Sequence, residues 1–197
     1  MTTFASTLGA RITAPGVTNL LATLILGHLI ADFPLQVNWV YRLKSRYWWG
    51  VVLHAAIHCV ITAMLLERPL AYWPVLVVLG LAHFATDWVK LRVDFKVQCH
   101  GFVLDQIAHA VALLLLATWQ PEMMGVLAPR VLYPAVGYAL VPALLIFVCI
   151  LATDLEQIAF CSSSSLESVI VKLIALSQVT GLPLVIGAVV VRFGVLC

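Results

Sequence analysis

Four apolar stretches of this chain each carry two side chains of a metal-binding type, spaced four residues apart. The chain has six histidines, and five of them belong to these pairs, so that only His100 stands outside, in an expected loop. A spacing of four residues puts both side chains on one face of an α-helix, one turn apart. The pairs are His28 with Asp32, His54 with His58, His83 with Asp87, and Asp105 with His109.

The chemistry of these side chains favours a metal site. Imidazole and carboxylate groups suit zinc, iron and manganese, and two ligands on one helical face is the arrangement that zinc-binding HExxH helices use. In helical bundles, ligands from neighbouring helices combine into di-metal centres. We therefore expect a divalent metal ion, zinc first and iron or manganese as alternatives, with ligands drawn from His28, His54, His58, His83 and His109.

Three aspartates complete the set and are the expected catalytic residues: Asp32, Asp87 and Asp105. Each is expected to bind the metal, to orient a histidine through its second ring nitrogen, or to move a proton. The set exceeds the four ligands of a closed zinc site, so either two ions bind or some members surround the ligands. The alternative is a purely structural hydrogen-bonded network between helices. His54 and His58 are the first candidates for ligands.

The composition indicates that these residues lie in a membrane. Of the 197 residues, 63% are hydrophobic and 10% are charged, with a mean hydropathy of +1.07, whereas about a quarter of a soluble domain is charged. The lipid bilayer is therefore the expected partner. The net charge of +2 and the scattered basic residues argue against a nucleic-acid-binding protein. The five cysteines lack CxxC spacing and are expected to be ordinary apolar residues.

Six apolar runs are long enough to cross a bilayer as helices, which takes roughly 20 residues each. They lack the two-residue alternation of barrel strands, so we expect an all-α, polytopic transmembrane helical bundle. The first four runs form a polar-centred core over residues 20–117, two additional helices follow over residues 131–191, and residues 1–197 form a single integral membrane domain. Pro34 is expected to end or kink the first run. The runs cover about residues 17–37, 48–66, 70–91, 102–119, 131–152 and 168–191.

The alternating direction of the helices brings the four pairs to one depth. Pairs late in the first and third spans, and early in the second and fourth, all lie near the same face of the membrane. Ionisable groups inside a span are costly unless they are paired or hydrated, and they face the bundle interior or a cavity. The first apolar run is expected to be retained rather than cleaved as a signal peptide.

Lysines and arginines predict which face this is. They are concentrated in the connections after the first and third spans, which makes that face cytoplasmic and puts both termini on the outer side. These basic residues are Arg42, Lys44, Arg46, Lys90, Arg92 and Lys96.

Three further polar residues lie between the pairs and this interface: Gln36, Lys90 and Gln106. We expect them to meet the anionic headgroup of a substrate. The alternative is ordinary interfacial polarity, with the long lysine side chain extending to water.

Four ordered motifs resemble the domain-of-unknown-function family 3307, whose members are bacterial membrane proteins without an assigned activity. The resemblance covers about residues 20–117 and implies that the pairs form one site in the bacterial inner membrane, but it supplies no reaction. A looser likeness of the motifs alone links them to membrane-bound metal-dependent hydrolases. The motifs are GHLIADF at residues 27–33 with Gln36, Leu53-His54 with His58, HFATD at residues 83–87 with Lys90, and Leu104-Asp105-Gln106 with His109.

The expected function is metal-dependent hydrolysis of a lipid-linked or amphipathic substrate. The metal would activate a water molecule, and an aspartate or histidine would move its proton. One alternative is a proton-coupled or metal-ion transporter that uses the same groups. Another is a non-catalytic subunit of a membrane complex, in which the polar network holds four helices together. Haem ligation would leave the three aspartates unexplained.

Overall fold

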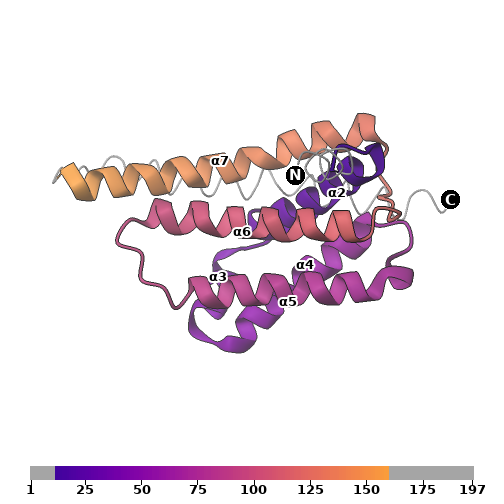
Figure 1. Cartoon of the computed structure of the whole chain (residues 1–197). Helices are drawn as coiled ribbons and strands as arrows, with labels where there is room; N and C mark the ends of the chain where they lie inside the picture. Colours follow the sequence, from indigo (N-terminus) through magenta and orange to yellow (C-terminus); the bar gives the residue numbers. More distant parts are fainter. Residues whose placement is uncertain (1–11, 160–197) are drawn as a thin grey trace, which may run out of the picture.

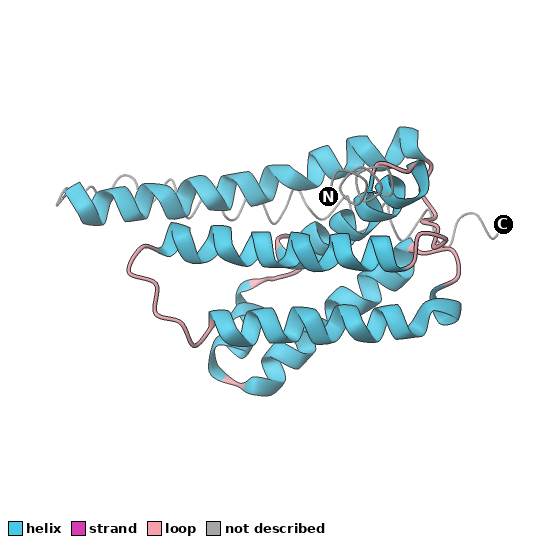
Figure 2. Ribbon diagram, in the orientation of Figure 1, coloured by secondary structure: helices cyan, strands magenta, loops and turns pink. Residues whose placement is uncertain are grey.

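The fold is an all-α bundle, known from a computed structural model that describes residues 12–159. No strand occurs among these residues, and the long helices lie alongside one another (Figures 1 and 2). The predicted all-α helical bundle is confirmed. The helices are α2 (Pro15–Asp32), α3 (Asn38–Arg46), α4 (Trp48–Leu65), α5 (Trp73–Lys90), α6 (Gln98–Trp119) and α7 (Pro129–Ala159), with a short 3-10 helix at Pro69–Tyr72 before α5.

Five segments of the described chain are long and apolar enough to cross a membrane, and they correspond to the first five predicted runs. The sixth predicted run, residues 168–191, lies outside the described residues. The five segments are Pro15–Asp32, Trp48–Leu65, Pro69–Lys90, Gln98–Trp119 and Pro129–Leu155.

The first run ends at Pro34 as predicted: α2 ends at Asp32, because proline has no N–H to donate to the helix. Two other features differ from the prediction. Helix α6 begins at Gln98, so that His100 lies in its first turn and not in a loop as predicted. The connection between the first two spans, predicted as a loop, contains the nine-residue helix α3.

Helix α2 is the central element of the bundle. It packs against α4, α6 and α7 and is buried along most of its length, whereas only a small part of α5 and α7 is buried. At Gly27 it approaches α4 so closely that an added Cβ would lie 3.0 Å from the Thr62 hydroxyl oxygen. Small residues permit such close contact between membrane helices. The approach brings the pair on α2 next to the pair on α4.

The end of the bundle opposite the pairs is fixed by backbone contacts. Leu66 forms an isolated antiparallel bridge with Gly125, and the N–H of Glu67 donates to the carbonyl of Met124 at 3.0 Å. Gly125 also lies against the side chain of Thr23, which a Cβ at this position would overlap. These contacts join the α4–α5 connection, the α6–α7 connection and α2.

Candidate metal centre

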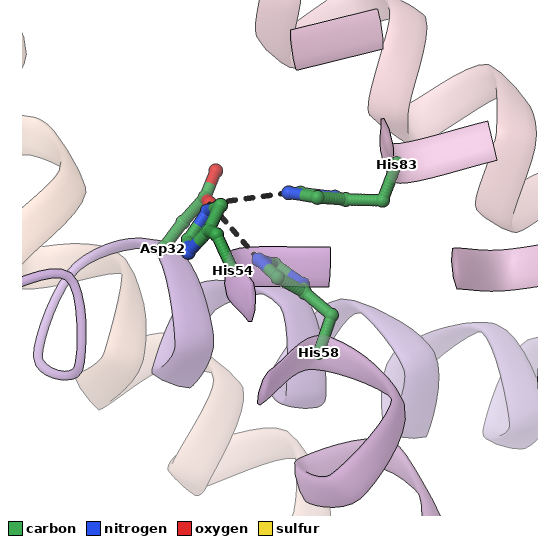
Figure 3. Close-up of side chains that lie close together, drawn as sticks. All are labelled: Asp32, His54, His58 and His83. Atoms are coloured by element: carbon green, nitrogen blue, oxygen red, sulfur yellow. Dashed lines mark hydrogen bonds and ion pairs between the residues drawn. The ribbon is translucent and has the colours of Figure 1, made fainter. Parts of the chain in front are cut away.

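Three imidazoles from two other helices lie around the carboxylate of Asp32, the last residue of α2. Its Oδ1 lies 2.9 Å from Nε2 of His54 and 3.0 Å from Nε2 of His58, both on α4. Nε2 of His83, on α5, lies 3.7 Å from the same oxygen. Figure 3 shows the three rings pointing toward this carboxylate. Because His54 and His58 are one turn apart, a single face of α4 supplies both.

The second oxygen of Asp32 faces His28, which in turn contacts the remaining histidine, His109. Oδ2 lies 3.4 Å from Nε2 of His28, and the ring of His28 lies 4.7 Å, centroid to centroid, from the ring of His109 on α6. Nε2 of His109 is in turn 3.4 Å from Oδ1 of Asp105. The structure thus brings the side chains of all four predicted pairs into one cluster.

Asp87, on α5, connects the cluster to α3. Its Oδ2 lies 3.5 Å from Nε2 of His83 and 3.7 Å from Nε2 of His54. The ammonium group of Lys44 donates to both carboxylate oxygens, at 3.2 and 3.3 Å. From the sequence, Lys44 was expected only to be a basic residue of a connection. Lys44 lies four residues after Val40, so both side chains are on one face of α3, and both are buried. This spacing was the signal in the sequence that could have shown that Lys44 faces inward.

Gly50 explains how Lys44 reaches the cluster. A Cβ at Gly50 would overlap the backbone of Leu43 and Lys44, so α3 lies directly on the first turn of α4. Only glycine leaves room for this approach of one backbone to another. The position of α3, and with it the position of the Lys44 ammonium group, therefore depends on the absence of a side chain at residue 50.

The cluster is buried, and part of its ligand capacity is unused. His54 and His58 are 0% and 1% exposed, and the other members of the pairs are also buried. Among the described side chains, four buried cluster atoms make no hydrogen bond: Nδ1 of His54, Nε2 of His83, Oδ1 of Asp105 and Nε2 of His109. The last two face each other at 3.4 Å, and Nε2 of His83 has only longer contacts with carboxylates, at 3.5 and 3.7 Å. Buried polar atoms are normally satisfied. This donor set fits a bound cation.

The spacing of the ligand atoms also fits a metal ion. One oxygen of Asp32 and one nitrogen each of His54, His58 and His83 all lie within 4.8 Å of one another. In a tetrahedral zinc site with bonds of about 2.0–2.1 Å, ligand atoms are roughly 3.4 Å apart, so small side-chain shifts would suffice. Two overlapping sets meet the same distance limit: His28 with His83 and His109, and Asp32 with Asp105 and His109.

A cavity of about 550 Å³ opens beside the cluster and is lined by all three predicted headgroup residues. Lys90 donates to Asp105 Oδ2 at 2.6 Å. The amide of Gln106 donates to the same oxygen at 3.3 Å, and its carbonyl oxygen lies 3.4 Å from Nε2 of His28. Gln36 lines the cavity with a buried carbonyl oxygen that has no partner among the described residues. Asp32 and Asp87 also line it.

Asp154 on α7 positions the start of α6 and was not predicted from the sequence. Its carboxylate accepts the backbone N–H of Gln98 at 3.2 Å and that of Cys99 at 2.7 Å. The first N–H groups of a helix lack partners within the helix, and a carboxylate there also stabilises the helix dipole. No local signal links residues so far apart in sequence. The contact orients the helix that carries Asp105 and His109.

The comparison with protein families agrees with the motifs. Residues 20–129 match the family described as a protein of unknown function (DUF3307). The matched segment includes every residue of the four pairs. The predicted resemblance is thus confirmed, and it extends to residue 129. No curated protein and no solved structure matches the chain. Because the match covers more than half of the 197 residues, the chain belongs to the DUF3307 family.

Proposed function

We propose that the cluster binds a divalent metal ion and that the protein is a membrane-embedded, metal-dependent hydrolase of a lipid-linked or amphipathic substrate. One observation carries the proposal: three buried imidazoles converge on the carboxylate of Asp32 beside a cavity of about 550 Å³. A structural network alone does not require three histidines at one oxygen. A cavity of this volume is large enough for the polar part of a substrate.

The candidate ligands of the proposed site are Asp32, His54, His58 and His83. Three of these four would hold a zinc ion and leave its fourth position open, as catalytic zinc sites require. Three nitrogens and a carboxylate oxygen favour zinc, with iron or manganese as alternatives. When bound, the ion would supply Lewis acidity for hydrolysis. Asp87 is the proposed proton acceptor, because it lies at the cavity wall 3.5 Å from Nε2 of His83. Lys44 would hold this carboxylate in place.

A two-ion form of the site is supported by the orientation of Asp32. Its Oδ1 faces the histidines of α4 and α5, and its Oδ2 faces His28. The two overlapping sets, His28 with His83 and His109 and Asp32 with Asp105 and His109, would supply the ligands of a second ion. Carboxylates shared between neighbouring helices are typical of di-metal bundles. The ratio of metal to protein distinguishes this form from the one-ion form.

We also propose that the cluster lies near the cytoplasmic face of a bacterial inner membrane. Support comes from the basic residues at the cluster end, including Arg42 and Arg46 on α3, and from the exposed aromatic residues Trp39, Tyr41 and Trp48 beside them. Alkaline phosphatase fused after Lys96 would then remain inactive, whereas a fusion after Arg68 would be active. The reverse pattern would overturn this orientation.

Metal analysis of the purified full-length protein tests the site. We expect at least one ion per chain in the wild type and a large loss in His54→Ala/His58→Ala. His100→Ala is the matched control, because His100 is exposed and outside the cluster. Substoichiometric metal in the wild type, unchanged in the double variant, would overturn the proposal.

The reaction is tested separately from the metal. The metal-loaded protein is incubated with phospholipids and other amphiphilic esters, and we expect hydrolysis that the double variant lacks. Metal or proton uptake by proteoliposomes, without hydrolysis of any amphiphile, would instead support a transporter.

A further inference from the structure

A second cavity, of about 380 Å³, lies between α5 and α6. We call it the α5–α6 groove. Small side chains line it on both helices, Ala85 and Thr86 on α5 and Ala108 on α6, and the ring of Phe95 lies against Gly101. Val89 and Leu104 line it and are exposed. On helices that cross a membrane, exposed apolar residues face lipid, so the groove opens sideways to the bilayer.

The α5–α6 groove adjoins the polar cavity beside the cluster. The two cavities share five lining residues: Lys90, Val93, Phe95, Gly101 and Asp105. The ion pair of Lys90 with Asp105 stands where they meet, and these are the charged residues that line the groove. The Lys90 side chain is 34% exposed, whereas that of Asp105 is 3% exposed. Lys90 is therefore the accessible cation at this junction.

The surroundings determine what fits the groove. Apart from Lys90, Asp105 and Thr86, its lining is apolar, which suits a hydrocarbon chain. A hydrocarbon chain in the groove would point its headgroup toward Lys90 and the polar cavity. Asp87 pairs with Lys44 and Asp32 contacts imidazoles, whereas Asp94, which also lines the polar cavity, is exposed. Asp105 accepts one of the three ammonium hydrogens of Lys90. The others remain available to an anionic headgroup, since the Lys90 side chain is partly exposed.

We propose that the α5–α6 groove admits one hydrocarbon chain of an anionic amphiphile directly from the bilayer, with Lys90 binding the headgroup at the entrance to the cavity. The proposal gives the chemical class of the substrate, an anionic amphiphile. It rests on the proposed function for one step, the hydrolysis of the headgroup. Binding in the groove does not require that a metal is present. The two proposals can therefore fail independently.

Photolabelling of the full-length protein in lipid vesicles tests the groove. The probes are phosphatidic acid and phosphatidylcholine, each with a diazirine on an acyl chain, in vesicles of phosphatidylcholine. We expect phosphatidic acid to label groove residues of α5 and α6 several-fold more than the exposed residues of α7. Unlabelled phosphatidic acid should compete, and phosphatidylcholine should not. Equal labelling of the groove and α7, without competition, would overturn the proposal.

Variants at two alanines of α6 sharpen the test. Ala108→Trp fills the groove and should abolish the excess labelling, whereas Ala110→Trp should leave it unchanged, because Ala110 is exposed outside the groove. Lys90→Gln should remove the preference for phosphatidic acid while chain labelling persists. Labelling unaffected by Ala108→Trp would contradict the groove. The competition in the wild type still tests the groove if this variant misfolds.

Metal content, measured on the same samples, separates the two proposals. Excess labelling of the groove in a protein without metal would keep this inference and overturn the proposed function. Stoichiometric metal without excess labelling would keep the proposed metal site and overturn this inference.

Discussion

Lys44 on α3 and Asp87 on α5 form a buried ion pair at the edge of the cluster. The Lys44 Nζ lies 3.2 Å from Oδ2 of Asp87, and the two side chains are 7% and 2% exposed. Asp87 also faces His83 and His54. The pair therefore joins a short surface helix to the proposed ligands, and its disruption would affect both.

Lys44→Met should destabilise the protein strongly. Removal of one partner leaves the other as an unpaired buried charge, which costs about 3–5 kcal/mol. Thermal unfolding in detergent measures the effect. The control is Lys96→Met, since Lys96 is exposed in the α5–α6 connection. If both variants unfold at the same temperature, the pair contributes nothing.

Asp32→Asn should lower the affinity for zinc at least about 10–100-fold, the loss typical even of residues that only support metal ligands. The substitution keeps the shape of the side chain but removes the charge at which three imidazoles converge. Competition with a fluorescent zinc chelator gives the affinity. Glu122→Gln, at an exposed carboxylate outside the cavity beside the cluster, should bind zinc as the wild type does. Equal affinities of Asp32→Asn and wild type would contradict the assignment of this ligand.

A chelator should lower the unfolding temperature of the wild type, and added zinc should restore it. An ion that binds only the folded chain adds about 2.7 kcal/mol at a hundred times its Kd. His54→Ala/His58→Ala should unfold at the same temperature with and without the chelator. A chelator effect of equal size in both proteins would place the ion elsewhere.

Gly50→Ala should destabilise the protein by about 1–3 kcal/mol, the usual cost of overpacking. The added methyl group overlaps the backbone of Leu43 and Lys44 and pushes α3 away from α4. Gly137→Ala is the matched control, because nothing lies within 4 Å of a Cβ there. Within α7 this control should be neutral or stabilising by up to about 1 kcal/mol. Chemical denaturation of both variants provides the comparison, and equal effects would show that the contact is not tight.

Asp154→Ala should cost about 0.5–2 kcal/mol, the range for loss of a helix cap. The N–H groups of Gln98 and Cys99 would lose their acceptor. Hydrogen exchange at the first turn of α6 should become faster. Thr118→Ala should not change this exchange, since the Thr118 hydroxyl bonds only carbonyls of its own helix. Unchanged protection in Asp154→Ala would rule out the cap.

The features that could be predicted are those that follow from the sequence of one segment at a time. Apolar length indicated the helices, and a spacing of four placed His54 and His58 on one face. The alternation of spans then implied that residues as distant as His28 and His109 would meet, and their rings are 4.7 Å apart. These inferences need only the helical period and the thickness of a bilayer.

The unpredicted residues depend on partners in other helices. Helix α3 is short and polar, so that apolar length does not reveal it, and its buried Lys44 is explained only by Asp87. Asp154 resembles any polar residue near the end of an apolar helix until the start of α6 is placed beside it. The α5–α6 groove likewise depends on which alanines face each other across two helices.

The bridge between Leu66 and Gly125 means that the two ends of the bundle are held together by different kinds of contact. At that end, backbone hydrogen bonds fasten the connections together. At the cluster end, the described helices are joined by hydrogen bonds of side chains, including Asp32, Asp87 and Asp154, and by the close approach of α3 to α4 at Gly50. An ion held between α2, α4 and α5, as proposed, would therefore cross-link three helices at the end where no described backbone hydrogen bond joins them.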